Sequence, residues 1–131
     1  MVIDSSAVIA IFLNEPERDQ LLEIIYQSGK RLLSAATLVE AGIVLESRRK
    51  DMAAHELNLF LHGLDIEVVS VDQAQAEQAR IAYRKYGKGR HPAGLNFGDC
   101  FTYALATVSG EPVLAKGNEF RRANLQMCEA G

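Results

Sequence analysis

The chain has 131 residues, a length that fits one compact domain over residues 1–131 and leaves little room for a second. Hydrophobic residues make up 48% of it, enough for one core, and the net charge of −3 gives no sign of a nucleic-acid partner. Cys100 and Cys128 lack CxxC or Cys/His spacing, which argues against a disulfide scaffold or a zinc site. Because no apolar stretch is long enough to span a membrane and the first residues lack the basic region of a signal peptide, we expect a cytoplasmic protein without membrane contact.

Strands and helices are expected to alternate along the chain. In the first half, the pattern predicts a strand at residues 2–3, helices at 5–13 and 17–28, a strand at 31–34, and helices at 37–50 and 52–64. In the second half it predicts a strand at 67–71, a helix at 73–86 capped by Asp72, a loop at 87–94, a helix at 99–109, a strand at 113–115 and an edge strand at 124–128. This order is typical of an α/β sandwich on a parallel sheet, which binds ligands beyond the carboxyl ends of its strands.

Three acidic residues stand near the predicted ends of strands. Asp4 directly follows the first strand, Glu40 lies in the first turn of the helix after the second strand, and Asp99 lies in the first turn of a later helix. A right-handed crossover into the strand at 113–115 would bring Asp99 to the rim that holds the other two acids. Carboxylate oxygens are the ligands that Mg²⁺ and Mn²⁺ prefer, so the three acids predict a divalent-metal site.

Each of these acids also has a structural alternative. Glu40 follows Thr37 by three residues, which is the spacing of a capping box, and Asp99 follows Asn96 in the same way. Asp4 could cap the first helix, a role that the adjacent serines, Ser5 and Ser6, offer as well. One carboxylate can both cap a helix and bind a metal, so the sequence leaves both interpretations open.

A basic segment precedes Asp99. Between residues 78 and 98 there is no acid, and five basic residues occur there: Arg80, Arg84, Lys85, Lys88 and Arg90. We interpret Arg84, Lys85, Lys88, Arg90 and His91 as RNA-binding residues beside the site, the alternative being a solvated basic face. Tyr83, Tyr86 and Phe97 could stack on bases, although core packing is favoured for the two tyrosines.

Other classes of protein stay open at this stage. A metal-free ribonuclease would need a general acid and base, for which His91 is the candidate, whereas His55 and His62 lack a phosphate site nearby. A receiver-like domain would also carry an acid after the first strand, but it usually has a second Asp where this chain has Ser6. A pure interaction module would leave the three acids at the rim unexplained.

Four segments of the chain resemble PIN-domain ribonucleases, and most of all the VapC-type toxins of bacterial toxin–antitoxin pairs. The segments are MVIDSSAVIAIFLNEP, LLSAATLVEAGIVLESR, GLNFGDCFTYALA and LAKGNEFRRANL, in the family's order. The resemblance implies a three-layer sandwich with a parallel five-stranded sheet flanked by helices. It also implies endonucleolytic RNA cleavage by a water activated by Mg²⁺, with Mn²⁺ as an alternative ion. Asp4, Glu40 and Asp99 fall on the three central acidic positions of the family, and Glu119 adds a fourth catalytic position.

The closing motif departs from the family pattern. Glu119 stands where the family usually has Asp, and Asn124 stands where it commonly has another Asp. Glu119 reaches one methylene further, and the neutral Asn124 is a poorer ligand for a hard cation. The resemblance therefore leaves open whether the site holds one ion or two. Ser5 also replaces a Thr that is frequent in the family, which keeps the hydroxyl.

Partners are implied by the resemblance and by apolar surfaces. The family resemblance implies a homodimer and a cognate VapB-like antitoxin. The helix containing residues 7–13 is apolar at every position, and Leu59 lies off the apolar stripe of its own helix. We therefore predict an exposed apolar groove near the acids, including Ile11 and Leu59, that receives a helix of the antitoxin and an Arg directed at the acids. The alternative is that these helices cover one another.

Overall fold

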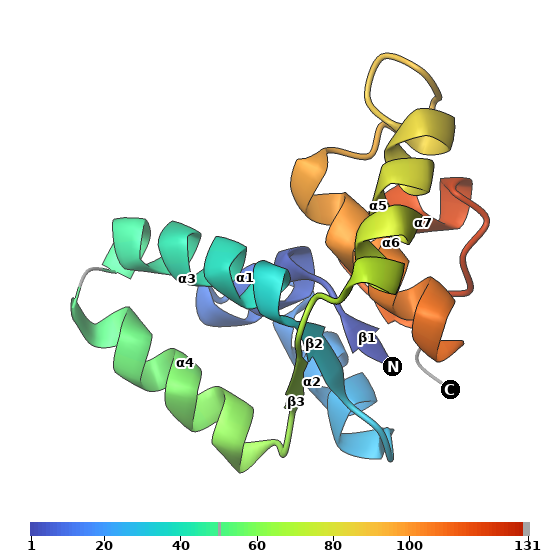
Figure 1. Cartoon of the computed structure of the whole chain (residues 1–131). Coiled ribbons are helices and arrows are strands. Elements are labelled where there is room, and N and C mark those ends of the chain that lie inside the picture. The colour runs from blue at the N-terminus through green and yellow to red at the C-terminus, as the bar shows by residue number, and fades with distance from the viewer. Residues whose placement is uncertain (50, 130–131) are drawn as a thin grey trace.

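A short parallel sheet lies between helices in the computed structural model, which describes residues 1–49 and 51–129 (Figure 1). Its strands are β1 (Val2–Ile3), β2 (Leu32–Ser34), β3 (Glu67–Val69) and β4 (Val113–Leu114), in the order β3-β2-β1-β4 and parallel at every pairing. The helices are α1 (Ser5–Phe12), α2 (Arg18–Gln27), α3 (Ala35–Arg49), α4 (Asp51–Gly63), α5 (Gln73–Tyr86), α6 (Phe97–Ser109) and α7 (Glu119–Arg122). None of the described helices has the length and hydrophobicity needed to cross a membrane.

The expected fifth strand is not formed within the described residues. The tail at residues 124–128 makes a single bridge, between Val113 and Met127, with backbone bonds of 2.9 Å and 2.8 Å on either side. Asn124, at the start of this tail, has a left-handed backbone (φ 66°), and the strand it would pair with, β4, is only two residues long. The ladder therefore ends after one bridge, and the sheet has four strands instead of five.

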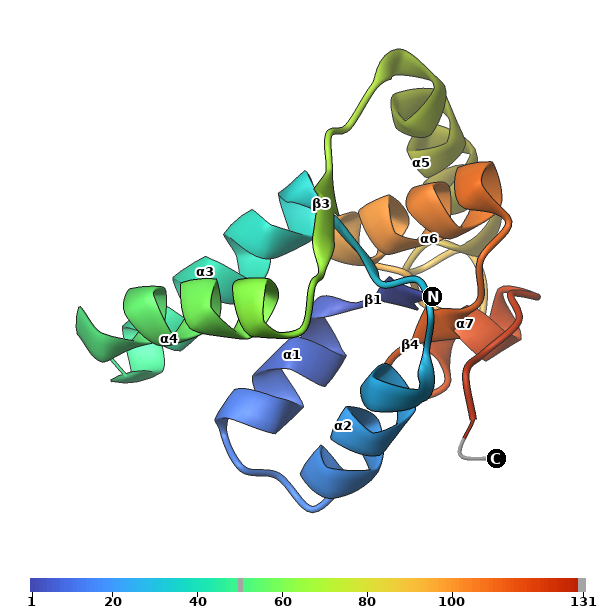
Figure 2. The same cartoon turned by 90° about the horizontal axis from the view of Figure 1, so that it is seen from below.

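Alternate residues of each strand face the two helical layers. Ile3, Leu33 and Leu114 belong to one core, which they share with side chains of α1–α4. Val2 and its neighbours on the adjacent strands, Leu32 and Val113, belong to a second core with α5, α6 and α7. Figure 2 shows α1 and α2 on one side of β1 and α5 and α6 on the other. All three of these strands are thus buried on both faces, as their unbroken apolar sequences require.

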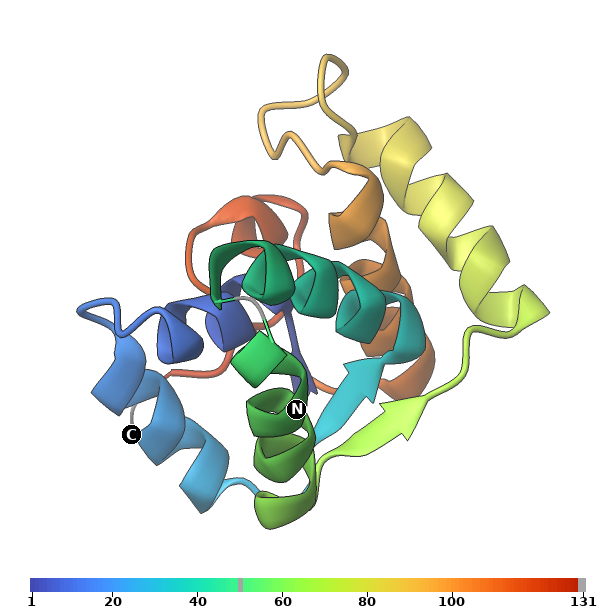
Figure 3. The same ribbon diagram turned by 90° about the vertical axis from the view of Figure 1, so that its left-hand side faces the viewer.

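Helix α1 is apolar all round because its own chain covers it. It contacts α2 and α3, and Ile11 is only 4% exposed. Helices α3 and α4 pack side by side and turn one face of this layer to solvent (Figure 3). The alternative, that the helices cover one another, therefore holds for α1, and the expectation that Ile11 lies exposed in a groove is wrong.

The first residues of three helices, α3, α1 and α6, can be compared with the predicted capping residues. Helix α3 begins at Ala35, directly after β2, where the Ser34 hydroxyl accepts a hydrogen bond from the backbone N–H of Ala36 (3.3 Å). Thr37 is therefore inside the helix, and the expected Thr37–Glu40 capping box is wrong. The expected last residue of that helix, at position 50, lies outside the described residues.

Asp4 caps α1, and the serines do not, because its own carboxylate accepts the backbone N–H of Ser6, the second residue of the helix. The capping box of Asn96 and Asp99 is present, and it starts α6 at Phe97, two residues before the expected start.

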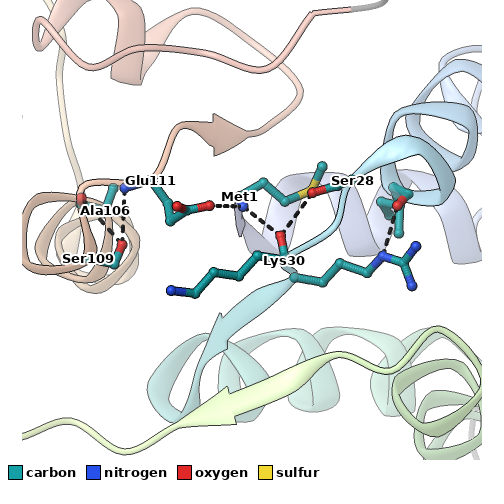
Figure 4. Close-up of polar contacts among 8 residues, drawn as sticks. Met1, Ser28, Lys30, Ala106, Ser109 and Glu111 are labelled. Atoms are coloured by element: carbon teal, nitrogen blue, oxygen red, sulfur yellow. Dashed lines mark hydrogen bonds and ion pairs between the residues drawn. The ribbon is translucent and has the colours of Figure 1, made fainter.

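The amino end of β1 is tied down at the opposite rim from Asp4. The α-ammonium group of Met1 donates hydrogen bonds to the carbonyl of Lys30 and to Glu111 Oε1, both at 2.6 Å (Figure 4). The Met1 ammonium lowers the pKa of the Glu111 carboxyl, since it hydrogen-bonds to the charged form. These contacts join β1 to the segments that lead into β2 and β4, and so fix the register that carries Asp4 to the carboxyl rim.

Candidate active site at the carboxyl ends of the strands

Asp4 is a buried carboxylate with two hydrogen-bonded oxygens. Asp4 directly follows β1 in the chain and is 2% exposed. Oδ2 accepts the N–H of Ser6 (3.1 Å), and Oδ1 accepts the hydroxyl of Thr102 on α6 (2.7 Å). The Thr102 hydroxyl also lies 3.4 Å from that of Thr37 on α3. Asp4 therefore joins α1, α3 and α6 at one point, and the capping role coexists with a fixed orientation at the strand end.

Glu40 lies on α3 with its carboxylate against the first turn of α6. A Cβ atom added to Gly98 would lie 2.6 Å from Glu40 Cδ and 2.7 Å from Oε1, closer than side chains approach. Among the described residues, the buried Oε1 of Glu40 has no hydrogen-bond partner. A buried carboxylate oxygen without a donor is costly, so this atom is suited to a cation.

Asp99 shows that the acids gather. Its pKa is raised to about 6, mainly by burial and also by the negative charges of Asp4, Glu119 and Glu40, while the backbone N–H of Asn96 lowers it. That N–H donates to Oδ2 at 3.0 Å, and the Asn96 side chain accepts the N–H of Asp99 at 2.9 Å. Asp4, Glu40 and Glu119, which are far apart in the sequence, thus each lie close enough to Asp99 to disfavour its charged form.

Glu119 is the first residue of α7, and the loop before it is hydrogen-bonded to α1. Its carboxylate folds over Gly117, whose left-handed backbone (φ 102°) would bring an added Cβ to 2.7 Å from Oε2. The preceding backbone is held because the N–H of Lys116 donates to the Ser6 hydroxyl (3.0 Å). Asn124, the other departure from the family pattern, donates its amide to the Tyr86 hydroxyl at 3.2 Å.

The donor set fits a hard divalent cation with water in its coordination shell. Among the side chains that the structure describes, those of residues 1–49 and 54–129, no three of His, Cys, Asp or Glu lie close enough together to bind an ion by themselves. Mg²⁺ usually takes only one or two carboxylates directly and keeps several waters. The unpartnered oxygen of Glu40 and the repulsion around Asp99 are both features that a cation would relieve.

The basic segment is exposed beside the site. Arg84 and Lys85 end α5, and Lys88 and Arg90 lie in the loop that projects beyond the helices (Figure 1). In the described part of the chain none of these four side chains forms an ion pair. His91 is differently placed, because its Nδ1 accepts the N–H of Ala93 (3.0 Å) and its ring packs edge-on against Tyr86, with 5.0 Å between the ring centres.

Two residues of this site were not found from the sequence. Thr102 is a buried hydroxyl among apolar neighbours on α6, and its position three residues after Asp99 was a signal that could have pointed to it. Gly98 gave no such signal, because its importance depends on which distant side chain packs over it.

Comparisons with known proteins identify the family of the chain. A family model described as PIN domain matches residues 1–125. Ribonuclease VapC of Mycolicibacterium smegmatis is 51% identical over 121 residues, which cover 92% of this chain and 94% of that protein. Ribonuclease VapC30 of Mycobacterium tuberculosis is 44% identical over 125 residues, which cover 95% of each chain.

Two solved structures share the fold at low sequence identity. The crystal structure of Mycobacterium tuberculosis VapC20, described as a sarcin-ricin loop cleaving toxin, matches with a TM-score of 0.80 and 17% identity, over 98% of each chain. A toxin–antitoxin complex from Klebsiella pneumoniae matches with a TM-score of 0.65 and 16% identity, over 89% of this chain and 86% of that one. The chain therefore belongs to the PIN-domain family and, within it, to the VapC ribonucleases.

Proposed function

We propose that this ribonuclease is a divalent-metal-dependent endoribonuclease and the toxin of a type II toxin–antitoxin pair. Asp4, Glu40 and Asp99 would hold the ion, and Glu119 would complete the catalytic group. The observation that carries the proposal is the gathering of three carboxylates, those of Asp4, Glu40 and Glu119, around the carboxylate of Asp99. An interaction module would have no use for such repulsion in its folded state.

Each acid has a distinct contribution in this proposal. Asp4 is fixed by the Thr102 hydroxyl, and Glu40 offers an oxygen that no protein donor occupies. Asp99 is oriented by the capping box at the start of α6. A bound Mg²⁺ or Mn²⁺ would lower the pKa of a coordinated water and neutralise charge on the phosphate oxygens. Because Glu119 is longer than the family's Asp and Asn124 is bonded to Tyr86, we favour one tightly held ion.

Metal removal and acid replacement test the proposal together. Cellular RNA is incubated with the protein after treatment with EDTA, and again after Mg²⁺ or Mn²⁺ is returned in excess. We expect no cleavage with EDTA, full recovery with metal, and near loss of cleavage in Asp99→Asn. Glu46→Gln, which removes an exposed acid elsewhere on α3, is the matched control and should cleave as the parent does. Undiminished cleavage with EDTA would contradict metal dependence.

A metal-free mechanism based on histidine finds no support in the geometry. One nitrogen of His91 already accepts a backbone hydrogen bond, and no described carboxylate pairs with its ring. His55 and His62 are exposed on α4, outside the acidic site. The exposed cations at Arg84, Lys85, Lys88 and Arg90, together with His91, are proposed to meet RNA phosphates instead.

An antitoxin is the proposed protein partner, and a homodimer the proposed assembly. A pocket of about 650 Å³ opens between α1, α2 and α4, where Tyr26 and Leu59 are 62% and 59% exposed. An amphipathic antitoxin helix would fit against this apolar surface and could direct an Arg toward the acids. Ile11 lines this pocket but is itself buried, so it packs beneath the surface without being exposed.

We propose a cytoplasmic location for the toxin and its antitoxin.

A further inference from the structure

A second pocket, of about 610 Å³, lies between α5 and α6 next to the acidic site. Its lining includes three aromatic rings, Tyr83, Phe97 and Phe101, and two cationic side chains, Arg80 and Lys88. Its volume is in the range of pockets that bind small organic groups. Neither the fold nor the acid site accounts for this combination of rings and charges.

The aromatic side chains are exposed where folding gives no reason for exposure. Phe97 is 78% exposed and stands edge-on against Phe101, with 5.0 Å between the ring centres. Tyr83 is 39% exposed, and the guanidinium of Arg90 lies over its ring at 5.8 Å. A nucleobase can stack on a flat, exposed aromatic ring, and such stacking is open to all four bases.

The charges of this pocket suit a polyanion. Arg80, Lys88 and Arg90 are exposed, and no ion pair between described residues engages any of them. Acids are absent from the sequence between residues 78 and 98, so nothing in the segment itself neutralises these cations. An apolar floor with a cationic rim matches a base attached to phosphates better than it matches an apolar peptide.

The pocket borders the acidic site through two of its lining residues, Asn96 and Phe97. Asn96 lines it and exchanges two hydrogen bonds with Asp99, at 3.0 Å and 2.9 Å. Phe97 also lines a neighbouring pocket, of about 490 Å³, whose wall includes Glu40 and Gly98. Phe97 therefore lines both the second pocket and the neighbouring pocket that includes Glu40.

We propose that the pocket between α5 and α6 binds one unpaired base of the RNA substrate, next to the phosphate that is cleaved. Phe97 and Tyr83 stack on the base, while Arg80 and Lys88 contact the flanking phosphates. The proposal rests on the proposed ribonuclease function and adds to it a specific binding site for one base. Phe97 is the residue on which this site depends most.

Binding in the absence of metal tests the pocket separately from cleavage. The probe is a short single-stranded RNA that carries 2-aminopurine, whose fluorescence falls on stacking, and it is titrated with the protein in EDTA. Phe97→Ala is expected to bind about ten- to a hundredfold more weakly, with the salt dependence of binding unchanged. Arg80→Gln is expected to lower the slope of log K against log salt by about 0.7, the value for one phosphate contact on a single strand.

Two exposed positions provide matched controls. Val108→Ala removes an exposed apolar side chain from the other end of α6, and Arg48→Gln removes an exposed cation from α3. Both should bind the probe as the parent does. Because Phe97 is exposed, Phe97→Ala should also melt at the parent temperature, which separates a binding defect from a folding defect.

A probe lacking one base provides the decisive comparison. The second probe has an abasic nucleotide beside the cleaved bond. The parent should bind this probe as weakly as Phe97→Ala binds the complete probe, and Phe97→Ala should bind both probes equally. Equal affinity of parent and Phe97→Ala for the complete probe, or no binding by the parent, would overturn the pocket proposal even if the parent cleaves RNA. A change in self-association without a change in RNA affinity would also overturn it, assigning the pocket to a contact between copies. Failure of the parent to cleave would instead contradict the proposed function.

Discussion

The hydroxyl of Thr102 donates a 2.7 Å hydrogen bond to Oδ1 of Asp4, although the two residues are 98 positions apart in the chain. Both side chains are buried, Thr102 completely and Asp4 to within 2%. Hydrogen-bond donors stabilise the charged form of a buried carboxylate. The Thr102 hydroxyl also fixes the orientation of the Asp4 carboxylate oxygens. The orientation of a proposed metal ligand on β1 is thus determined by a residue on α6.

Thr102→Val should therefore cost both stability and activity. It keeps the shape of the side chain and removes the donor, which leaves a buried charged acceptor unsatisfied. We expect the free energy of unfolding, measured with urea, to fall by about 1.5–3 kcal/mol, the usual value for hydrogen bonds to charged groups. Thr102→Ser, which keeps the hydroxyl, should retain most of the cleavage rate that Thr102→Val loses. An equal fall of the cleavage rate in Thr102→Val and Thr102→Ser would mean that side-chain packing matters at this position and the hydrogen bond does not.

Gly98→Ala should separate activity from stability. The added Cβ would overlap with the carboxylate of Glu40, a flexible group that can swing away, so folding should be unharmed. Alanine is also favoured over glycine inside helices by about 1 kcal/mol. Displacing a catalytic acid by about 1 Å can lower turnover by about a hundredfold, so we expect a large fall in kcat at an unchanged melting temperature.

Gly42→Ala is the matched control for this change. It lies two residues from Glu40 on the same helix, and its added Cβ would meet neighbours only at ordinary contact distances of 3.5 Å and 3.9 Å. Its kcat should equal that of the parent. Normal turnover in Gly98→Ala would show that Glu40 does not need its observed position.

Asp99 should make the metal-free protein less stable as the pH rises. Its pKa of about 6 in the folded state exceeds the ordinary value of 3.8, so the folded state holds a proton more tightly. The free energy of unfolding then falls between about pH 4 and 6, and the penalty is complete above pH 6. Asp99→Asn removes it, so in EDTA at pH 7.5 the variant should be more stable by about 1–2 kcal/mol, after allowance for solvent screening. The difference should shrink toward pH 4, and an equal gain at both pH values would exclude this cause.

The apolar positions Ile11 and Leu59 should respond in opposite ways to a charge. Ile11 is 4% exposed, so Ile11→Glu buries an unpaired carboxylate and should destabilise the fold by about 3 kcal/mol or more. Leu59 is 59% exposed, so Leu59→Glu should leave the melting temperature near that of the parent. If the pocket beside Leu59 receives the antitoxin or a second copy, this variant should instead weaken that association in sedimentation velocity experiments. Unchanged association would remove Leu59 from the proposed interface.

The sequence predicted the parts of the fold that depend on local pattern. Strand and helix order follows from short apolar runs and helical spacing, and the capping box of Asn96 and Asp99 has a local signature. The positions of Asp4, Glu40 and Asp99 relative to the strand ends predicted that they share one rim of the sheet, and the family resemblance added the fourth acid, Glu119. The start of α3 was wrong because Ser34 caps it from within a strand, which no spacing rule indicates.

The parts that could not be predicted depend on contacts between distant segments. The expected fifth strand failed because of the left-handed residue Asn124, whose conformation is fixed by the end of α7. The burial of Ile11 depends on α2 and α3 covering α1, and the sequence of α1 alone is equally consistent with an intermolecular face. Gly98 and Thr102 matter only through side chains at least 58 positions away, so their roles appear only once the fold is known.

The chemical nature of the cleaved ends tests the central claim most directly. Hydrolysis by a water held near these carboxylates and a divalent ion leaves a 5′-phosphate and a 3′-hydroxyl, because the water attacks the phosphate. A metal-free mechanism that used His91 would employ the neighbouring 2′-hydroxyl and leave a cyclic phosphate. We predict that RNA cleaved by the parent in Mg²⁺ has 5′-phosphate and 3′-hydroxyl ends and that Asp4→Asn produces neither. Cyclic phosphate ends, formed equally in EDTA, would contradict the account.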